Sequence, residues 1–259
     1  MKTYALANQK GGVGKTTTAV SLGAYLAGRG LRVLLVDLDP QANATSALGC
    51  RRSANEPSSY HLLLDSRALP EVCCPTPQPG LDLLPSSPAL VGAEVELVSL
   101  MAREYRLQRA LASITGYDFV LIDSPPSLGL LTVNALTAAD EVLVPVQCEY
   151  LALEGLTQLL GTIDLVRNNL NQGLRLGGLI LTMYDGRTSL SRQVADEVRA
   201  HFPSTFRSVI PRSIRLSEAP SFGKPIFLYD PTCRGAQAYA ALGEEVLALN
   251  GYSTQAVSS

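Results

Sequence analysis

A glycine-rich loop near the start of the chain carries the residues best suited to chemistry. Residues 10–17 read Lys-Gly-Gly-Val-Gly-Lys-Thr-Thr. Glycines let backbone N–H groups close around phosphate oxygens, the helix that follows adds the positive end of its dipole, and Lys15 supplies a point charge. Thr16 would offer its hydroxyl to Mg²⁺. The loop therefore predicts a binding site for a nucleoside triphosphate.

This loop departs from the common phosphate-binding pattern at one position and carries an unusual residue at the next. The pattern places a glycine five residues before Gly14, where this chain has Gln9. It leaves the next position open, where this chain has Lys10. A second lysine beside the phosphates is as informative as the match itself.

Two apolar runs end in carboxylates at distances that suit the loop. Residues 33–36 lead into Asp37 and Asp39, and residues 119–122 lead into Asp123. Residues two apart on a strand point to the same side, so we expect Asp37 and Asp39 both to face the loop. Ligands of doubly wound sheets bind at the carboxyl edge of the strands, which is where Asp123 would lie.

Phosphoryl transfer suggests a role for each carboxylate, because positioning and charge stabilisation do most of its catalysis. Asp123 would hold Mg²⁺, directly or through water, together with Thr16. We expect Asp39 to orient the attacking water and accept its proton, with Asp37 supporting the metal or that water. The plainer alternative is that Asp37 or Asp39 is only the N-cap of a helix over residues 41–48.

Apolar runs alternate with amphipathic stretches along the chain, which is typical of a parallel sheet wrapped by helices. We expect an α/β fold, a doubly wound and mostly parallel sheet with helices on both faces, in a single domain over residues 1–259. A helix should begin at Thr16 and end at Gly28 and Gly30, so that strand, loop and helix come in the required order. The expected strands are residues 4–7, 33–38, 81–84, 119–122, 141–146, 178–182 and 208–210.

Two further stretches are read as connections or ends. Residues 50–80 are rich in proline, serine and arginine, so they can form neither a long helix nor a central strand and are expected to be a surface connection. Residues 251–259 are small and polar and should fray.

Composition places the chain among compact globular proteins, with 46% apolar and 17% charged residues. Neither a signal peptide nor a membrane span fits the N-terminus, so we expect a cytoplasmic protein without a membrane partner. The five cysteines, odd in number and without C-x-x-C spacing, predict reduced structural thiols. The net charge is −2, but residues 160–235 hold 10 Lys and Arg against 6 Asp and Glu, which indicates a basic face.

Three of these motifs together resemble the deviant phosphate-loop ATPases, in particular the ParA/Soj chromosome-partitioning branch. They are the loop at residues 10–17, Val-Asp-Leu-Asp-Pro-Gln-Ala-Asn-Ala-Thr at 36–45, and Leu-Ile-Asp-Ser-Pro-Pro-Ser at 121–127. Stretches at 181–190, 209–226 and 229–235 are similar to the same branch, so the likeness covers nearly the whole chain. It implies an ATPase that depends on Mg²⁺.

The resemblance also implies roles at the nucleotide. Lys10 would cross the interface of an ATP-sandwich dimer and contact the phosphates bound by the other subunit, although it could instead serve only its own nucleotide. Pro211 would help to hold the adenine. The implied nucleotide contacts are Lys10, Gly11, Gly12, Val13, Gly14, Lys15, Thr16, Thr17 and Pro211; Lys10, Lys15 and Asp39 would be catalytic, and Thr16, Asp37 and Asp123 would lie at the metal.

DNA and a protein partner follow from the same resemblance. The ATP-bound dimer would bind DNA without sequence preference through Arg187, Arg212 and Arg215, and would associate with the nucleoid. A ParB/Spo0J-like centromere-binding protein would stimulate hydrolysis and release. Arg192 and Arg199, on an expected helix over residues 189–201, are read as a solvated face.

Three alternatives remain beside this interpretation. Within the family, the cargo could be a plasmid or another assembly, which the nucleotide motifs do not separate. A MinD-like membrane ATPase would need a basic amphipathic helix at the C-terminus, and no Lys or Arg follows Arg234. A nitrogenase iron-protein-like electron donor would need a cysteine shortly after Asp123, and residues 124–137 contain none.

Overall fold

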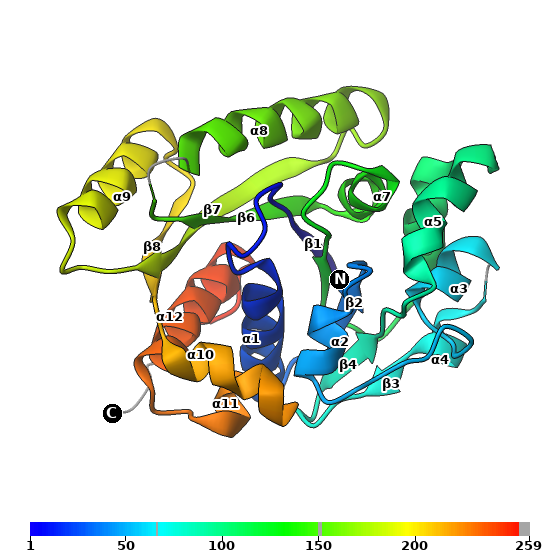
Figure 1. Cartoon of the computed structure of the whole chain (residues 1–259), viewed down its shortest axis with the longest axis horizontal. Coiled ribbons are helices and arrows are strands. Elements are labelled where there is room, and N and C mark those ends of the chain that lie inside the picture. The colour runs from blue at the N-terminus through cyan, green and yellow to red at the C-terminus, as the bar shows by residue number, and fades with distance from the viewer. Residues whose placement is uncertain (66, 150–151, 254–259) are drawn as a thin grey trace.

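One twisted sheet organises the chain, whose computed structural model describes residues 1–65, 67–149 and 152–253 (Figure 1). Its eight strands lie in the order β3-β4-β2-β5-β1-β6-β7-β8. All neighbours are parallel except β3, which runs antiparallel to β4. The strands are β1 (Lys2–Leu6), β2 (Val33–Asp37), β3 (Cys74–Pro75), β4 (Leu81–Leu84), β5 (Phe119–Asp123), β6 (Glu141–Gln147), β7 (Arg175–Tyr184) and β8 (Thr205–Pro211). The predicted α/β class with a mostly parallel sheet is confirmed.

Helices cover both faces of this sheet, as the apolar character of the strands requires. Alternate residues of a strand enter different cores: Tyr4 and Leu6 of β1 pack on one face, and Ala5 packs on the other. The first core also takes in α1 (Lys15–Gly28), α2 (Asn43–Ala47), α10 (Ile214–Glu218), α11 (Ile226–Tyr229) and α12 (Arg234–Leu249). The second takes in α3 (Ser59–Leu64), α4 (Leu69–Val72), α5 (Leu90–Glu96), α6 (Arg106–Ala112), α7 (Leu130–Ala138), α8 (Ala152–Asn169) and α9 (Ser189–His201).

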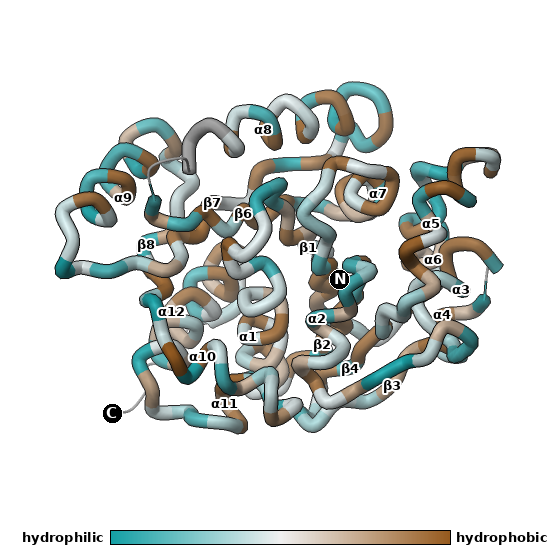
Figure 2. Tube along the Cα trace, viewed as in Figure 1, coloured by the Kyte–Doolittle hydropathy of each residue, from teal (hydrophilic) through white to brown (hydrophobic). Residues whose placement is uncertain are grey.

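Hydrophilic residues gather on the outer segments, among them α9 and the loop that leads into it (Figure 2). Three hydrophobic side chains of α9, Val194, Ala195 and Val198, are buried in the core against the sheet. Among the described residues, none of the helices combines the length and apolar character needed to cross a bilayer.

All seven predicted strands are present, with ends that differ by up to three residues. The largest extension is β7, predicted over 178–182 and observed over Arg175–Tyr184. The strand needs a glycine near its start, because a Cβ on Gly178 would lie 2.5 Å from the Phe206 ring of neighbouring β8. The helix at Ser189–His201 is confirmed, and α1 begins one residue earlier than predicted and ends at Gly28.

The segment at 50–80 is partly mispredicted. As expected, it forms no long helix and no central strand: it holds the short helices α3 and α4 and the edge strand β3. The expectation of a mere surface connection is wrong, because Leu62, Leu63, Leu69 and Val72 are buried in the core. These apolar residues, which lie between the prolines of the segment, pack in the same core as Leu84 of β4. The single-domain organisation stays a prediction, and residues 254–259 of the predicted frayed tail lie outside the described residues.

Candidate nucleotide-binding site

The loop between β1 and α1 has the backbone shape of an anion cradle. Gly12 (φ 75°) and Gly14 (φ 92°) lie in the left-handed region, where a side chain would be strained. Gly14 is the N-cap of α1 and offers no side chain to its first N–H groups. Those donors, at the positive end of a 14-residue helix, are therefore available to a bound anion.

Lys15 is buried beneath this loop, only 6% exposed. Its ammonium donates to the carbonyl oxygens of Asn8 (2.9 Å) and Lys10 (3.5 Å). Burial lowers the pKa of Lys15, while the charges of Asp123 and Asp39 act in the opposite direction. A buried ammonium held by neutral carbonyls would be stabilised by an anion in the loop.

Thr16 and Asp123 meet at the carboxyl edge of the sheet. Thr16 Oγ1 donates to Asp123 Oδ2 at 2.7 Å, and Asp123 is fully buried. Within the described part of the chain, Asp123 Oδ1 accepts no hydrogen bond. Burial, followed by the neighbouring Asp37 charge, raises the pKa of Asp123 well above its usual range. A cation beside the bare oxygen would reverse that effect.

Thr16 and Asp123 suit Mg²⁺, which needs few protein ligands, better than a metal ion whose ligands all come from the protein. Across residues 1–65, 67–149 and 152–253, no group of three or more His, Cys, Asp or Glu side chains is placed to hold a metal ion. Mg²⁺ commonly takes one or two carboxylates together with water and substrate phosphates. Thr16 and Asp123 would leave room for such ligands.

Asp37 and Asp39 have different surroundings, which the sequence did not indicate. Asp37 is fully buried beside Asp123 on the adjacent strand. Its Oδ2 accepts from the backbone N (2.8 Å) and Oγ1 (2.7 Å) of Thr45, and its Oδ1 accepts from Asp39 N (3.1 Å). Burial raises the pKa of Asp37 to about 6, although the hydrogen bonds from Thr45 and Asp39 act to lower it. Thr45 lies in the first turn of α2, whose N-cap residue is Ala42, so Asp37 contacts this helix but is not its N-cap, in contrast to the plainer alternative.

Asp39, in contrast, lines the cavity beside the loop. Its Oδ1 accepts from Gln41 N at 2.9 Å, which orients the carboxylate. Of the two carboxylates expected to face the loop, Asp39 is thus the one in the cavity wall, whereas Asp37 is directed toward α2. A metal role for Asp37 stays a prediction.

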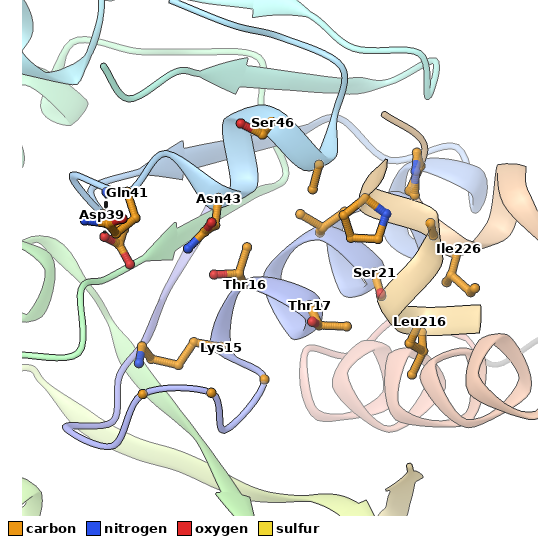
Figure 3. A pocket seen from close by; sticks show the side chains of 18 of the residues that line it. Lys15, Thr16, Thr17, Ser21, Asp39, Gln41, Asn43, Ser46, Leu216 and Ile226 are labelled. Carbon is orange, nitrogen blue, oxygen red and sulfur yellow. Dashed lines mark hydrogen bonds between the residues drawn. The ribbon is translucent and has the colours of Figure 1, made fainter. Parts of the chain in front are cut away.

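The cavity between the loop and the helices measures about 420 Å³, which suits a nucleotide (Figure 3). Figure 3 shows Lys15, Thr16 and Thr17 on one side, Asn43 and Ser46 from the α2 segment above them, and Leu216 and Ile226 opposite. The wall missed by the sequence analysis comes from the stretch 216–226, namely Leu216, Ala219, Pro220, Lys224, Pro225 and Ile226.

Pro211 is not among the described residues that line this cavity. It ends β8 and pairs with Tyr184 of β7. Its predicted adenine contact therefore gains no support from the geometry. A signal in the sequence lay nearby, because the missed wall belongs to the same 209–226 stretch that carried the family resemblance.

Lys10 does not line the cavity within the described part of the chain. Its Nζ lies 3.6 Å from Glu149 Oε2, and Arg212 Nη2 lies 3.4 Å from Oε1 of the same carboxylate. Gln147 Nε2 also donates to Glu149 Oε1, at 2.6 Å. One glutamate, which the sequence analysis did not single out, thus joins the distinctive loop lysine to a predicted DNA-binding arginine.

The three predicted DNA-binding arginines are exposed and each contacts a carboxylate. Arg187 pairs with Asp185 at 2.7 Å, and Arg215 lies 3.0 Å from Glu218 and 3.3 Å from Asp230. Arg187 and Arg212 follow the adjacent ends of β7 and β8, so they lie near the same edge of the sheet as the loop. Exposed ion pairs of this kind are weak and can be exchanged for phosphate contacts.

Comparisons with known proteins agree with this geometry. The model of a family described as "AAA domain" matches residues 1–176. The sporulation initiation inhibitor protein Soj of Bacillus subtilis is 55% identical over 95% of this chain and 98% of its own length. The chromosome-partitioning ATPase Soj of Thermus thermophilus is 56% identical over 96% of each chain.

A solved structure extends the likeness to the fold. It is described as cobyrinic acid a,c-diamide synthase from Mycobacterium smegmatis with a bound ATP analogue and magnesium. It is 42% identical, with a TM-score of 0.84 over 95% of this chain and 94% of that one. With the curated relatives matching nearly end to end, the chain belongs to the Soj/ParA family of chromosome-partitioning proteins.

Proposed function

We propose that this protein is an Mg²⁺-dependent ATPase that drives chromosome segregation through a nucleotide-controlled cycle of DNA binding. The observation that carries the proposal is the pairing of Thr16 with Asp123 beneath the loop, because it leaves one buried carboxylate oxygen bare beside a buried lysine. A site for Mg²⁺ and phosphate explains both features. The relatives named as partitioning ATPases support the choice of activity.

Each residue at the loop has a task in this proposal. Backbone N–H groups of residues 11–17 hold the phosphates, and Lys15 neutralises charge on the transferred group. Mg²⁺, when bound by Thr16 and Asp123, would stabilise the developing negative charge. Asp39 orients the attacking water and accepts its proton, and its position in the cavity wall supports that role.

The remaining steps join two copies of the chain to DNA. Lys10, exposed at the rim of the loop, reaches the phosphates of a second subunit when ATP closes the dimer. Arg187, Arg212 and Arg215 then exchange their carboxylate partners for DNA phosphates. A ParB/Spo0J-like protein stimulates hydrolysis, which returns the protein to the monomer and releases the nucleoid.

The decisive experiment measures DNA retention with ATP, with ADP and without nucleotide, in the presence and absence of a candidate ParB protein. We expect retention with ATP alone, shortened by the ParB protein together with faster phosphate release. Equal retention in all nucleotide states would contradict the switch.

Replacing Arg215 by glutamate should weaken DNA retention without affecting ATP hydrolysis in the absence of DNA. The change removes one phosphate contact and adds repulsion, so we expect retention to fall about tenfold or more and its dependence on salt to become shallower. Filter binding across a salt series measures both quantities.

Arg192→Glu is the matched control, because Arg192 is an exposed residue of α9 read as a solvated face. It should bind DNA nearly as the unaltered protein does. Full retention by Arg215→Glu, or an equal loss in both variants, would remove Arg215 from the DNA-binding surface.

A further inference from the structure

Two cysteines meet at the edge of the sheet, outside the residues that line the nucleotide cavity. The sulfur atoms of Cys50 and Cys74 lie 3.6 Å apart, at the distance of a thiol–thiol hydrogen bond. Both are free thiols and both are partly exposed. A small oxidant can therefore reach the pair, and little movement separates it from the roughly 2.05 Å of a disulfide.

The backbone holds each cysteine on a defined segment. Cys74 lies in β3, opposite Leu83 of β4 in the antiparallel ladder. Cys50 follows α2, and its N–H donates to the carbonyl oxygen of Thr45 at 3.1 Å. The proximity is therefore set by a sheet edge and a helix end, which are ordered parts of the fold.

The surroundings make the two sulfurs chemically unequal. The hydrogen bond between the two thiols is the main cause that lowers the pKa of Cys50, and the nearby charge of Arg52 acts in the same direction against partial burial. The same hydrogen bond, followed by burial, raises the pKa of Cys74. Cys50 is thus the nucleophile of the pair, since the thiolate is the reactive form.

Among the described residues, the other three cysteines lack a thiol partner of this kind. Burial raises the pKa of Cys73 to about 12 and that of Cys148 to about 11. Cys233 is matched to the pair in exposure, but in the described part of the chain its sulfur makes no hydrogen bond to a second thiol and only accepts from Ala236 N. Selective oxidation should therefore fall on Cys50 and Cys74.

We propose that Cys50 and Cys74 form a reversible redox site that takes a hydroperoxide as oxidant. The Cys50 thiolate attacks the outer peroxide oxygen, the O–O bond breaks, and Cys50 sulfenic acid forms with release of an alcohol or water after protonation. The Cys74 sulfur then displaces the hydroxyl as water, and the S–S bond forms. The two thiols lose two electrons to the peroxide, and a dithiol reductant reverses the change.

The location gives the bond a structural consequence. It would tie the exit of α2 to the sheet edge, and α2 supplies Asn43, Ser46 and Ala47 to the cavity wall. Just before Cys50, the backbone of Gly49 lies so close to Gly223 that a Cβ on Gly223 would be 2.7 Å from Gly49 Cα. This site is independent of the proposed partitioning function and goes beyond the expectation of reduced, mostly structural thiols.

The test uses the folded, full-length protein. After reduction and desalting, it is treated with a slight molar excess of hydrogen peroxide, the remaining thiols are alkylated, and peptides are mapped by mass spectrometry without reduction. We expect one intramolecular link, Cys50 to Cys74, that dithiothreitol reverses, with Cys73, Cys148 and Cys233 recovered as alkylated thiols.

Single cysteine-to-serine variants distinguish a specific link between Cys50 and Cys74 from non-specific oxidation of thiols. Cys50→Ser and Cys74→Ser should each abolish the link, and Cys74→Ser should accumulate a Cys50 sulfenic acid that dimedone captures. Cys233→Ser should form the link as the unaltered protein does. The proposal would be overturned if Cys50 and Cys74 stayed free after treatment, if the link persisted in Cys50→Ser, or if Cys74→Ser gave no dimedone adduct. Circular dichroism establishes that each variant is folded.

Discussion

Asp39→Asn should lower the rate of ATP hydrolysis about a hundredfold or more while leaving ATP binding nearly unchanged, because removing a general base typically costs a factor of 10² to 10⁴. Asparagine keeps the size of the side chain and can still accept the hydrogen bond from Gln41 N. It cannot accept the proton of the attacking water. The variant should therefore remain in its ATP-bound form and stay longer on DNA.

Phosphate release, fluorescent nucleotide binding and DNA retention measure these three effects separately. Asp37→Asn is the informative comparison, because both oxygens of Asp37 accept hydrogen bonds from the backbone and from Thr45. In Asp37→Asn, an amide nitrogen would replace one of these oxygens and would face an N–H or O–H donor that it cannot accept from. The lost hydrogen bond should lower the melting temperature of this variant. Turnover by Asp39→Asn within about twofold of the unaltered protein would exclude Asp39 as the base.

Lys10→Ala should impair ATP-dependent dimerisation or hydrolysis far more than nucleotide affinity. The side chain of Lys10 contacts Glu149 at the rim, whereas Lys15 provides the buried charge beneath the loop. Removing a cation that acts only on the transition-state charge typically costs a factor of about 10² to 10³ in rate. Nucleotide affinity should change by no more than about threefold, because the loop and Lys15 are left intact.

Glu149→Gln should act in the opposite direction and is the matched variant for Lys10. It keeps the shape of the side chain and removes the carboxylate that holds Lys10 at 3.6 Å and Arg212 at 3.4 Å. An exposed ion pair contributes at most about 1 kcal/mol, so dimerisation with ATP should strengthen by no more than about fivefold. Analytical ultracentrifugation with ATP and with ADP measures both variants. Dimerisation and turnover of Lys10→Ala equal to those of the unaltered protein would exclude the action of Lys10 in a second subunit.

The central strands and the phosphate loop could be predicted because their signals are local. Val33–Asp37 and Phe119–Asp123 are buried on both faces of a parallel sheet, so they read as continuous apolar runs. Gly12 and Gly14 stand where the backbone requires positive φ. The boundaries of β7 and the burial of the 50–80 segment were missed because packing against β8 and against the second core, and not local preference, decides them.

By itself, the sequence determined the fold class, the phosphate loop and the carboxylates at the strand ends, since each depends on residues adjacent in the chain. Only the tertiary structure decided how those groups divide the work. Thr16 meets Asp123 across 107 positions, Asp37 accepts hydrogen bonds from Thr45 of α2, and Glu149 joins Lys10 to Arg212. The stretch 216–226 closes the cavity, and Cys50 meets Cys74. Such contacts arise when distant segments pack together. The sequence alone could not show them, because a local pattern of residues does not specify which group from a distant segment will lie opposite a given side chain.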